Sequence, residues 1–378
     1  MKIVLICEAT FPESKGGLER WMVWLAKSLI EYGHEVVYIN AQCINTVRDG
    51  VQYISVRDKP WSYSSGGRRS VAQTLLFGIK TYAKLGKIEY DIIYATQAPI
   101  LSLYFICAAK LRKRNESVMI VEWLEIWPIN YWQDYMGKLM GYIGFLIQNR
   151  ALRIGEKKVC FTEHISKRLT ESNPNEQVLK LPGIAMQNQV IIPPPFSIKQ
   201  NIVFLSRLVP EKQPLLAIDS VVKFKQTGWN GIFYMIGTGP LLKQLSGYIK
   251  TIEAESYIKL LIDIPDEKVE EVFKSSFVLL HTSKREGFGL ALIEAAAYGV
   301  PPILLNYPEN LSTGLGILPE LVCDFFSPDE ISSKLQKAHQ NQEDHYQRIE
   351  NWLKNKYPSI LATKTLGLLD KEFKSFFS

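Results

Sequence analysis

The chain has 378 residues, of which 47% are hydrophobic and 22% are charged. These proportions are typical of a globular protein rather than a disordered one, and the length predicts two domains rather than one core. The net charge of +6 is too small to indicate nucleic-acid binding, and the sequence has no basic run with interleaved aromatic residues.

The N-terminal stretch lacks a signal-peptide cleavage pattern, and no apolar run approaches the roughly 18–20 residues needed to span a bilayer. We therefore expect the protein in the cytoplasm or at the inner face of the membrane. The five cysteines show no metal-ligand spacing, so we expect buried free thiols and no metal site. They are Cys7, Cys43, Cys107, Cys160 and Cys323.

Residues 1–186 alternate between apolar strand patterns and helical patterns. Lys2–Cys7 predicts a strand buried on both faces, and a glycine-containing loop, a helix (Leu18–Tyr32) and a strand (Glu35–Asn40) follow it. This alternation predicts a parallel, doubly wound sheet. Further strands are expected at Gln52–Val56, Asp91–Ala95, Val118–Glu122 and Lys157–Thr162, and further helices at about Arg69–Leu85, Leu101–Arg114 and Tyr131–Arg153.

The loop after the first strand contains Gly16 and Gly17. It lies at the carboxyl end of that strand, where ligands bind in open parallel sheets. The pair does not form a G-x-G-x-x-G pattern, and an isolated pair of glycines is also common in simple turns. Both interpretations of the pair stay open at this point.

Residues 187–200 are rich in proline and predict an interdomain linker. A second strand–helix series occupies residues 201–350, which makes the two halves Rossmann-like and favours an active site in a cleft between them. We expect residues 351–378 to form a C-terminal helix that packs across the domain junction.

One stretch of the second half, His281–Asn306, has the most distinctive pattern. A strand ends at His281, a loop contains Gly287 and Gly289, and a helix follows from Leu290 to Tyr298. Glycines let a backbone come close to a ligand, and the start of a helix offers unpaired N–H groups to an anion. Glu286 in the loop and Glu294 in the helix could bind the hydroxyl groups at two ends of an extended phosphorylated ligand such as a nucleotide sugar.

The loop after the strand Asn201–Ser206 carries two cations, Arg207 and Lys212. Both could bind a diphosphate and stabilise it as a leaving group, although isolated loop cations are also commonly just solvated. The two glutamates invite a second interpretation, the acid and nucleophile of a glycoside hydrolase. Their position beside loops suited to phosphate favours binding of hydroxyl groups instead.

These residues carry a family resemblance. Glu286-GFGLALI-Glu294 resembles the E-x7-E motif of retaining glycosyltransferases of family four, which have the two-domain GT-B fold. Ser206-Arg207-Leu208 with Glu211-Lys212 is similar to the family's cationic loop, and Gly237-Thr238-Gly239-Pro240 is similar to its G-x-G-P turn. Gly16-Gly17-Leu18-Glu19-Arg20 resembles the start of its acceptor domain. The matches span both halves of the chain in the family's order.

The resemblance implies a role for each matching residue. Arg207, Lys212 and Glu286 would form the catalytic set, with the two cations on the donor diphosphate and the carboxylate on the sugar hydroxyls. Glu294 would bind the ribose, and no metal or other cofactor would be needed. The remaining donor contacts would be Gly17, Gly237, Gly239, Gly287, Phe288, Gly289 and Leu290.

The sequence departs from the family pattern near the expected sugar-transfer centre. Many relatives have a histidine beside an acidic residue where this chain has Leu124 and Glu125. Glu125 could replace the missing contact, and His164 is a second polar candidate on the acceptor side. The aromatic stretch Trp123–Phe145 predicts either an acceptor groove or membrane-contacting face, or an ordinary core helix with its loop.

We therefore expect a retaining hexosyltransferase that moves a hexose from a UDP- or GDP-sugar to a glycan or lipid-linked acceptor. Such an enzyme would serve the synthesis of a cell-surface polysaccharide or glycolipid, with peripheral membrane contact as one option. Two alternatives remain: a nucleotide-sugar-binding protein with lost or altered transferase activity, and a GT-B nucleotide-sugar epimerase.

Overall fold

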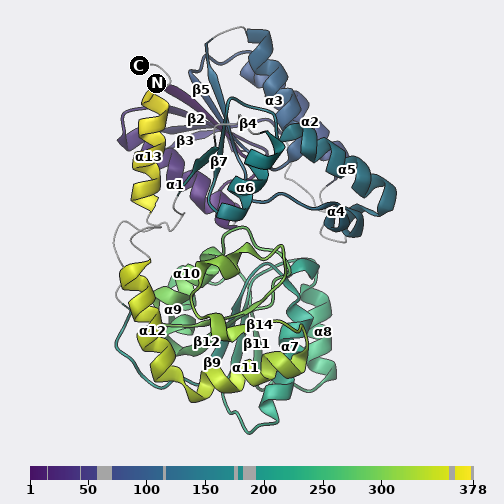
Figure 1. Ribbon diagram of the computed structural model, residues 1–378, viewed down its shortest axis with the longest axis vertical. Helices are drawn as coiled ribbons and strands as arrows, with labels where there is room; N and C mark the ends of the chain where they lie inside the picture. Colours follow the sequence, from purple (N-terminus) through teal and green to yellow (C-terminus); the bar gives the residue numbers. More distant parts are fainter. Residues whose placement is uncertain are drawn as a thin grey trace. The chain divides into compact units, whose positions relative to one another are not determined.

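The computed structural model describes residues 1–14, 16–42, 44–57, 70–113, 116–173, 178–181, 193–356 and 362–375 (Figure 1). Cys43 and residues 187–192 of the predicted linker lie outside these ranges. The described residues form two compact units. The first contains the residues up to Leu181 together with the C-terminal helix α13 (Ala362–Ser375), and the second contains residues 193–356.

The described part of the first unit is built on an eight-stranded sheet with the order β3-β4-β2-β1-β5-β6-β7-β8. Its neighbouring strands are parallel except β3 and β4, which are antiparallel. Central strands such as β5 are buried along their whole length, which explains their continuous apolar sequence. The strands are β1 (Lys2–Ile6), β2 (Glu35–Asn40), β3 (Thr46–Arg48), β4 (Val51–Ser55), β5 (Ile92–Thr96), β6 (Val118–Glu122), β7 (Lys157–Cys160) and β8 (Val178–Lys180).

Helices connect these strands. They are α1 (Gly17–Glu31), α2 (Val71–Leu85), α3 (Ile100–Lys113), α4 (Ile129–Met136), α5 (Lys138–Ala151) and α6 (Glu163–Ser172). Right-handed crossovers from β4 through β7 place α2, α3 and α5 on one face of the sheet, and Figure 1 shows these three helices together on one side of the unit. No described helix combines the length and apolar character needed to cross a membrane.

The second unit repeats this design with a six-stranded parallel sheet in the order β11-β10-β9-β12-β13-β14. Its strands are β9 (Asn201–Leu205), β10 (Phe233–Ile236), β11 (Ile258–Leu261), β12 (Ser276–His281), β13 (Pro302–Leu305) and β14 (Val322–Cys323). Its helices are α7 (Pro214–Lys225), α8 (Leu242–Thr251), α9 (Asp266–Ser275), α10 (Leu290–Ala297), α11 (Pro328–Gln340) and α12 (Gln342–Asn355), with 3₁₀ turns η1 (Pro210–Lys212), η2 (Leu311–Leu315) and η3 (Pro319–Leu321).

The strand order reverses once in each sheet. In the first unit the reversal falls between β1 and β5, and in the second between β9 and β12. In each sheet, the loops that follow the two strands at the reversal leave in opposite directions. A crevice therefore opens at the carboxyl ends of these strands, where open α/β sheets bind their ligands. The fold therefore directs attention to the loops after β9 and β12.

Three predicted element boundaries need correction. The single helix predicted over Tyr131–Arg153 is two helices, because Gly137 adopts a left-handed backbone (φ 83°) between α4 and α5. The strand predicted to reach Thr162 ends at Cys160. Thr162 instead caps α6, a helix not predicted from the sequence, by accepting a hydrogen bond from the Ile165 N–H at 3.3 Å.

The single tail helix predicted over residues 351–378 is also wrong in its boundaries. Residues up to Asn355 complete α12, while α13 is a separate helix within the first unit. There Phe373 is buried beside Tyr94, and Asp370 lies 2.9 Å from Nε2 of the buried His34. His34, for which the sequence predicted no long-range contact, therefore helps to anchor α13 on the first unit.

Candidate active site

The loops after β9 and β12 are joined by backbone and side-chain hydrogen bonds. The Lys284 N–H donates to the carbonyl oxygen of Glu211 at 2.8 Å, and the Thr282 hydroxyl donates to the carbonyl oxygen of Lys212 at 2.8 Å. Since β9 and β12 are neighbours at the reversal of the sheet, these bonds fix η1 against the β12–α10 loop. Lys212 and Glu286, 74 residues apart in the sequence, are thereby brought together.

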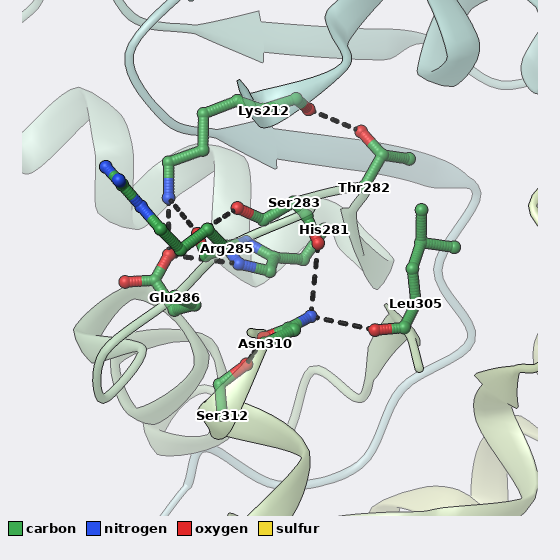
Figure 2. A network of polar contacts seen from close by, with 9 residues as sticks. All are labelled: Lys212, His281, Thr282, Ser283, Arg285, Glu286, Leu305, Asn310 and Ser312. Atoms are coloured by element: carbon green, nitrogen blue, oxygen red, sulfur yellow. Dashed lines mark hydrogen bonds and ion pairs between the residues drawn. The ribbon is translucent and has the colours of Figure 1, made fainter. Parts of the chain in front are cut away.

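Figure 2 shows the resulting polar cluster. The Lys212 ammonium donates to Oε2 of Glu286 at 2.5 Å and to the carbonyl oxygen of Arg285 at 3.3 Å. Nε2 of His281, the last residue of β12, lies 3.3 Å from the same carboxylate oxygen. The contacts found among the described residues converge on Oε2, so Oε1 of Glu286 is left to accept a hydrogen bond from a ligand.

The electrostatics of the cluster keep Glu286 ionised. Burial alone would raise the pKa of its carboxyl group, but the Lys212 charge and the contact with His281 outweigh burial and hold that pKa well below its usual range. Burial lowers the pKa of His281, so this imidazole is neutral near pH 7. One cation and one anion therefore share a nearly enclosed site. The side chains of Lys212 and Glu286 are only 13% and 21% exposed.

A buried asparagine holds the Glu286 loop in place. Nδ2 of Asn310 donates to the carbonyl oxygens of Leu305, at 2.9 Å, and Ser283, at 3.2 Å. The Ser312 hydroxyl donates to Oδ1 of Asn310 at 2.5 Å. The backbone of Glu286 also forms a parallel bridge with Asn310. Because these groups are fully buried and bonded, the loop is rigid before any ligand arrives.

The start of α10 lies directly after this loop. Gly289 caps the helix with a left-handed backbone (φ 86°), and a Cβ at that position would lie 2.8 Å from Cβ of Ser312. The first N–H groups of a helix have no intrahelical acceptor, so the amides of Leu290 and Ala291 are available to an anion, whereas the Leu292 N–H donates to the Gly289 carbonyl oxygen at 3.0 Å. Gly287 and Phe288 are buried beside them, and Glu294 lies half-buried in the middle of α10.

The backbone on both sides of Arg207 is in close contact with a glycine turn. A Cβ on Gly237 would lie 1.9 Å from the carbonyl oxygen of Ser206, and one on Gly239 would lie 2.4 Å from that of Leu208. Both glycines have positive φ angles, 149° and 158°. The Gly237–Pro240 turn therefore packs against the β9–η1 loop, where the Arg207 side chain is exposed. Within the described residues the Arg207 guanidinium has no ion-pair partner.

The other predicted site residues lie in the first unit, at the carboxyl edge of its sheet. Gly17 is the first residue of α1, Glu125 follows β6, and His164 is exposed in the first turn of α6. Oε1 of Gln97 accepts from the N–H groups of Leu124, at 2.8 Å, and Glu125, at 3.0 Å. The Glu125 carboxylate accepts from Nε1 of Trp127 at 2.8 Å, so this carboxylate is partly engaged already.

The sequence prediction missed His281 and Asn310 as members of the cluster. His281 was visible as the last residue of an apolar strand, which is a signal that its side chain is buried next to Glu286. Asn310 gave no such signal, because its role depends on how residues 305–312 fold back onto the β12–α10 loop.

Comparison with solved structures identifies the fold. Sucrose-phosphate synthase from Thermosynechococcus elongatus aligns over 100% of this chain and 99% of its own, with a TM-score of 0.76 and 14% identity. Anabaena Alr3699/HepE in complex with UDP and glucose aligns over 99% of this chain and 100% of its own, with a TM-score of 0.68 and 14% identity. The chain has the GT-B fold of glycosyltransferases, as predicted.

The sequence comparison adds a family match for the second unit. Residues 193–355, which make up the second unit, match the family model of glycosyl transferases group 1. Over 372 residues the chain is 22% identical to a phosphatidylinositol N-acetylglucosaminyltransferase component of Arabidopsis thaliana, covering 89% of this chain and 74% of the relative. The second unit therefore matches the glycosyl transferases group 1 model, in agreement with the predicted resemblance.

Proposed function

We propose that this chain is a glycosyltransferase that moves a hexose from a UDP- or GDP-sugar to a glycan or lipid-linked acceptor, with retention of configuration and without a metal. The observation that carries the proposal is the Lys212–Glu286 pair at the reversal point of the second sheet. In this role the Lys212 ammonium and the Arg207 guanidinium neutralise the donor diphosphate as it leaves. Oε1 of Glu286 accepts hydrogen bonds from the sugar.

The small contribution of a buried ion pair to stability supports a functional role for Lys212 and Glu286. Two nearly enclosed charges stabilise a fold little more than apolar side chains of the same size would. An ammonium has three N–H donors, and the described residues supply acceptors for two of them, Glu286 and the Arg285 carbonyl oxygen. The third donor can bind a phosphate oxygen. With the amides at the start of α10, it supplies positive charge where a metal would otherwise be needed.

The proposal keeps the remaining residues in the roles that the family resemblance implies. Glu294 binds the ribose, and the glycines of the three loops bind the diphosphate and sugar. Glu125 and His164 act on the acceptor side. Two similar proteins agree with this substrate class. The Arabidopsis relative is named for N-acetylglucosaminyl transfer and phosphatidylinositol, and the HepE structure contains UDP and glucose.

A panel of UDP-, GDP- and ADP-sugars tests the donor, with thermal unfolding as the readout. A ligand that binds only the native state raises the melting temperature, and the matching donor should do so in the presence of EDTA. No shift with any of these donors would contradict the proposal. Product analysis then separates the activities, because an epimerase converts the donor with no acceptor present and a transferase does not.

Leu124 motivates one competing function. Because the family's histidine is absent at this position, the chain could bind a nucleotide sugar without transferring it. A donor that shifts the melting temperature but is not consumed with any of a broad set of glycan and lipid-linked acceptors would favour this alternative. Transfer to any one of them would exclude it.

A further inference from the structure

The outward face of α5 has the wrong polarity for a helix in water. Its exposed side chains are five large apolar ones and a cation at each end: Leu139, Met140, Tyr142, Ile143 and Leu146, with Lys138 and Arg150. They recur at spacings of three and four residues, so they form one stripe along the helix. Leu139 is 73% exposed. The stripe is therefore a continuous apolar surface rather than a scatter of single residues.

The inward face of α5 is built from small and polar residues. Gly141 and Gly144 pack so closely on α4 that a Cβ would lie 2.4 Å from the Trp132 carbonyl oxygen or 2.5 Å from the Trp132 ring, respectively. Gln148 is buried, and its amide exchanges hydrogen bonds with the Trp127 backbone at 2.8 and 3.0 Å. The large apolar side chains consequently point outward because the small face fills the contact with α4.

Helix α2 also exposes large apolar side chains. It buries Phe77 and Leu85, but its other buried residues are small or polar (Thr74, Gly78 and Thr81), whereas Leu75, Leu76 and Ile79 are exposed. Gly78 allows α3 to approach, since a Cβ there would lie 2.4 Å from the Phe105 ring. Helices α2, α3 and α5 lie together on one face of the sheet (Figure 1), and each of them carries exposed apolar side chains on the surface that the three helices form. We call it the α2–α3–α5 surface.

The charge of these three helices has one sign. Together α2, α3 and α5 contain seven Lys and Arg residues and no Asp or Glu, in a protein whose total net charge is only +6. Lys110 and Lys113 pair with glutamates outside these helices. Within the described residues no ion pair is found for Lys84, Lys138 or Arg150. An apolar surface with unneutralised positive charge would repel a second copy of itself and attract an anionic partner.

We propose that the α2–α3–α5 surface docks on an anionic lipid bilayer. Helix α5 has 14 residues, about 21 Å of helix, which is too short to cross a hydrocarbon core of about 30 Å. It lies in the plane of the interface instead, with the apolar stripe among the acyl chains and Lys138 and Arg150 at the lipid phosphates. This docking rests on the first unit alone and does not depend on the proposed transfer reaction.

Vesicle sedimentation with the full chain tests the proposal. We expect binding to vesicles of equal parts phosphatidylglycerol and phosphatidylcholine, with at least tenfold weaker binding to phosphatidylcholine alone and weaker binding as salt rises. The double variant Leu139→Glu/Ile143→Glu should lower binding at least tenfold. Its matched control is Val47→Glu/Ile198→Glu, which places the same charge at exposed apolar positions outside the α2–α3–α5 surface and should bind as the unaltered chain does.

A second variant guards against misfolding of the first. Lys138→Gln/Arg150→Gln adds no charge to an apolar face, and it should lower binding to the anionic vesicles about tenfold with an unchanged melting temperature. Equal binding of both double variants and the unaltered chain would overturn the proposal. A chain that does not bind vesicles but forms a dimer in light scattering would also overturn it, if Leu139→Glu/Ile143→Glu abolishes that dimer. The surface would then join two copies of the protein.

Discussion

The Lys212 ammonium lies 2.5 Å from Oε2 of Glu286, although the two residues belong to different strand–helix connections. The pair forms because β9 and β12 are adjacent at the one reversal of their sheet. It holds an ionised carboxylate and a cation within reach of the same ligand. The predictions below test this pair, its glycine supports and two buried acids of the first unit.

Removal of the Lys212 ammonium should lower the stability of the folded chain. Lys212→Ala leaves the Glu286 carboxylate buried with only His281 beside it, so the pKa of Glu286 should rise. The loss of a buried ion pair's partner costs about 3 kcal/mol, which corresponds to a fall in melting temperature on the order of 5 °C. Thermal unfolding gives this value. Lys284→Ala, on the exposed neighbour, should leave the melting temperature within about 1 °C, and an equal fall in both variants would show that the pair is not the cause.

The close backbone contact at the Gly237 turn makes a prediction about stability. Gly237→Ala places a Cβ 1.9 Å from the Ser206 carbonyl oxygen at a backbone angle unfavourable for alanine, so it should destabilise the second unit by about 2–4 kcal/mol. Gly247→Ala is the matched control, because a Cβ there meets no atom within 4 Å and the residue lies inside α8. It should stabilise the chain by about 0.5–1 kcal/mol. Urea unfolding measures the free energy of unfolding of both variants, which should fall for Gly237→Ala and rise for Gly247→Ala.

Glu122 predicts a pH dependence of its own. Its carboxylate is fully buried and accepts hydrogen bonds from Nε1 of Trp21, at 2.8 Å, and from the Tyr94 hydroxyl. Burial raises the pKa of Glu122 from 4.5 to about 7 even though both hydrogen bonds lower it. Between these pH values the folded chain holds a proton that the unfolded chain has lost. Stability should therefore fall as pH rises from about 4.5 to about 7 and level off above it, by about 3 kcal/mol in total.

Glu122→Gln isolates this effect, because the amide does not titrate. The melting temperature of the variant minus that of the unaltered chain should increase between pH 5 and pH 7.5. Glu286 does not confuse the result, since its lowered pKa places its own loss of stability at acid pH. A difference that stays constant over this range would contradict the assignment.

The C-terminal helix should depend on the His34–Asp370 pair. Asp370→Ala leaves the buried imidazole of His34 without its acceptor and removes the partner of Lys374, so docking of α13 should weaken by about 1–3 kcal/mol. Hydrogen exchange of the α13 amides measures this directly, and faster exchange is expected. Lys371→Ala, on the exposed side of the same helix, should leave the exchange rates unchanged.

Much of the fold could be predicted from the sequence because its strands are buried on both faces. The predicted and observed bounds of β2 and β6 are the same. The break between α4 and α5 was missed, since Gly137 in an apolar, aromatic stretch is also compatible with a continuous helix. The pairing of His34 with Asp370, 336 residues away, has no local signal at all.

The candidate site was predictable only in part. The glycines and charges near Glu286 mark a ligand loop by their chemistry, so Lys212 and Glu286 were found. Their contact with each other depends on the order of strands, which local patterns do not encode. His281 belongs to the site through its burial beside Glu286, and Asn310 through its hydrogen bond to Ser283, 27 residues away, and only the folded chain displays these contacts.

Sugar transfer by Glu286→Gln tests the central claim most directly. The change keeps the shape of the side chain but removes the charge that pairs with Lys212, and it should lower the transfer rate at least about 100-fold with the identified donor and acceptor. Lys284→Ala, assayed alongside, should transfer at the unaltered rate. Undiminished transfer by Glu286→Gln and by Lys212→Ala would contradict the assignment of this pair as the donor site.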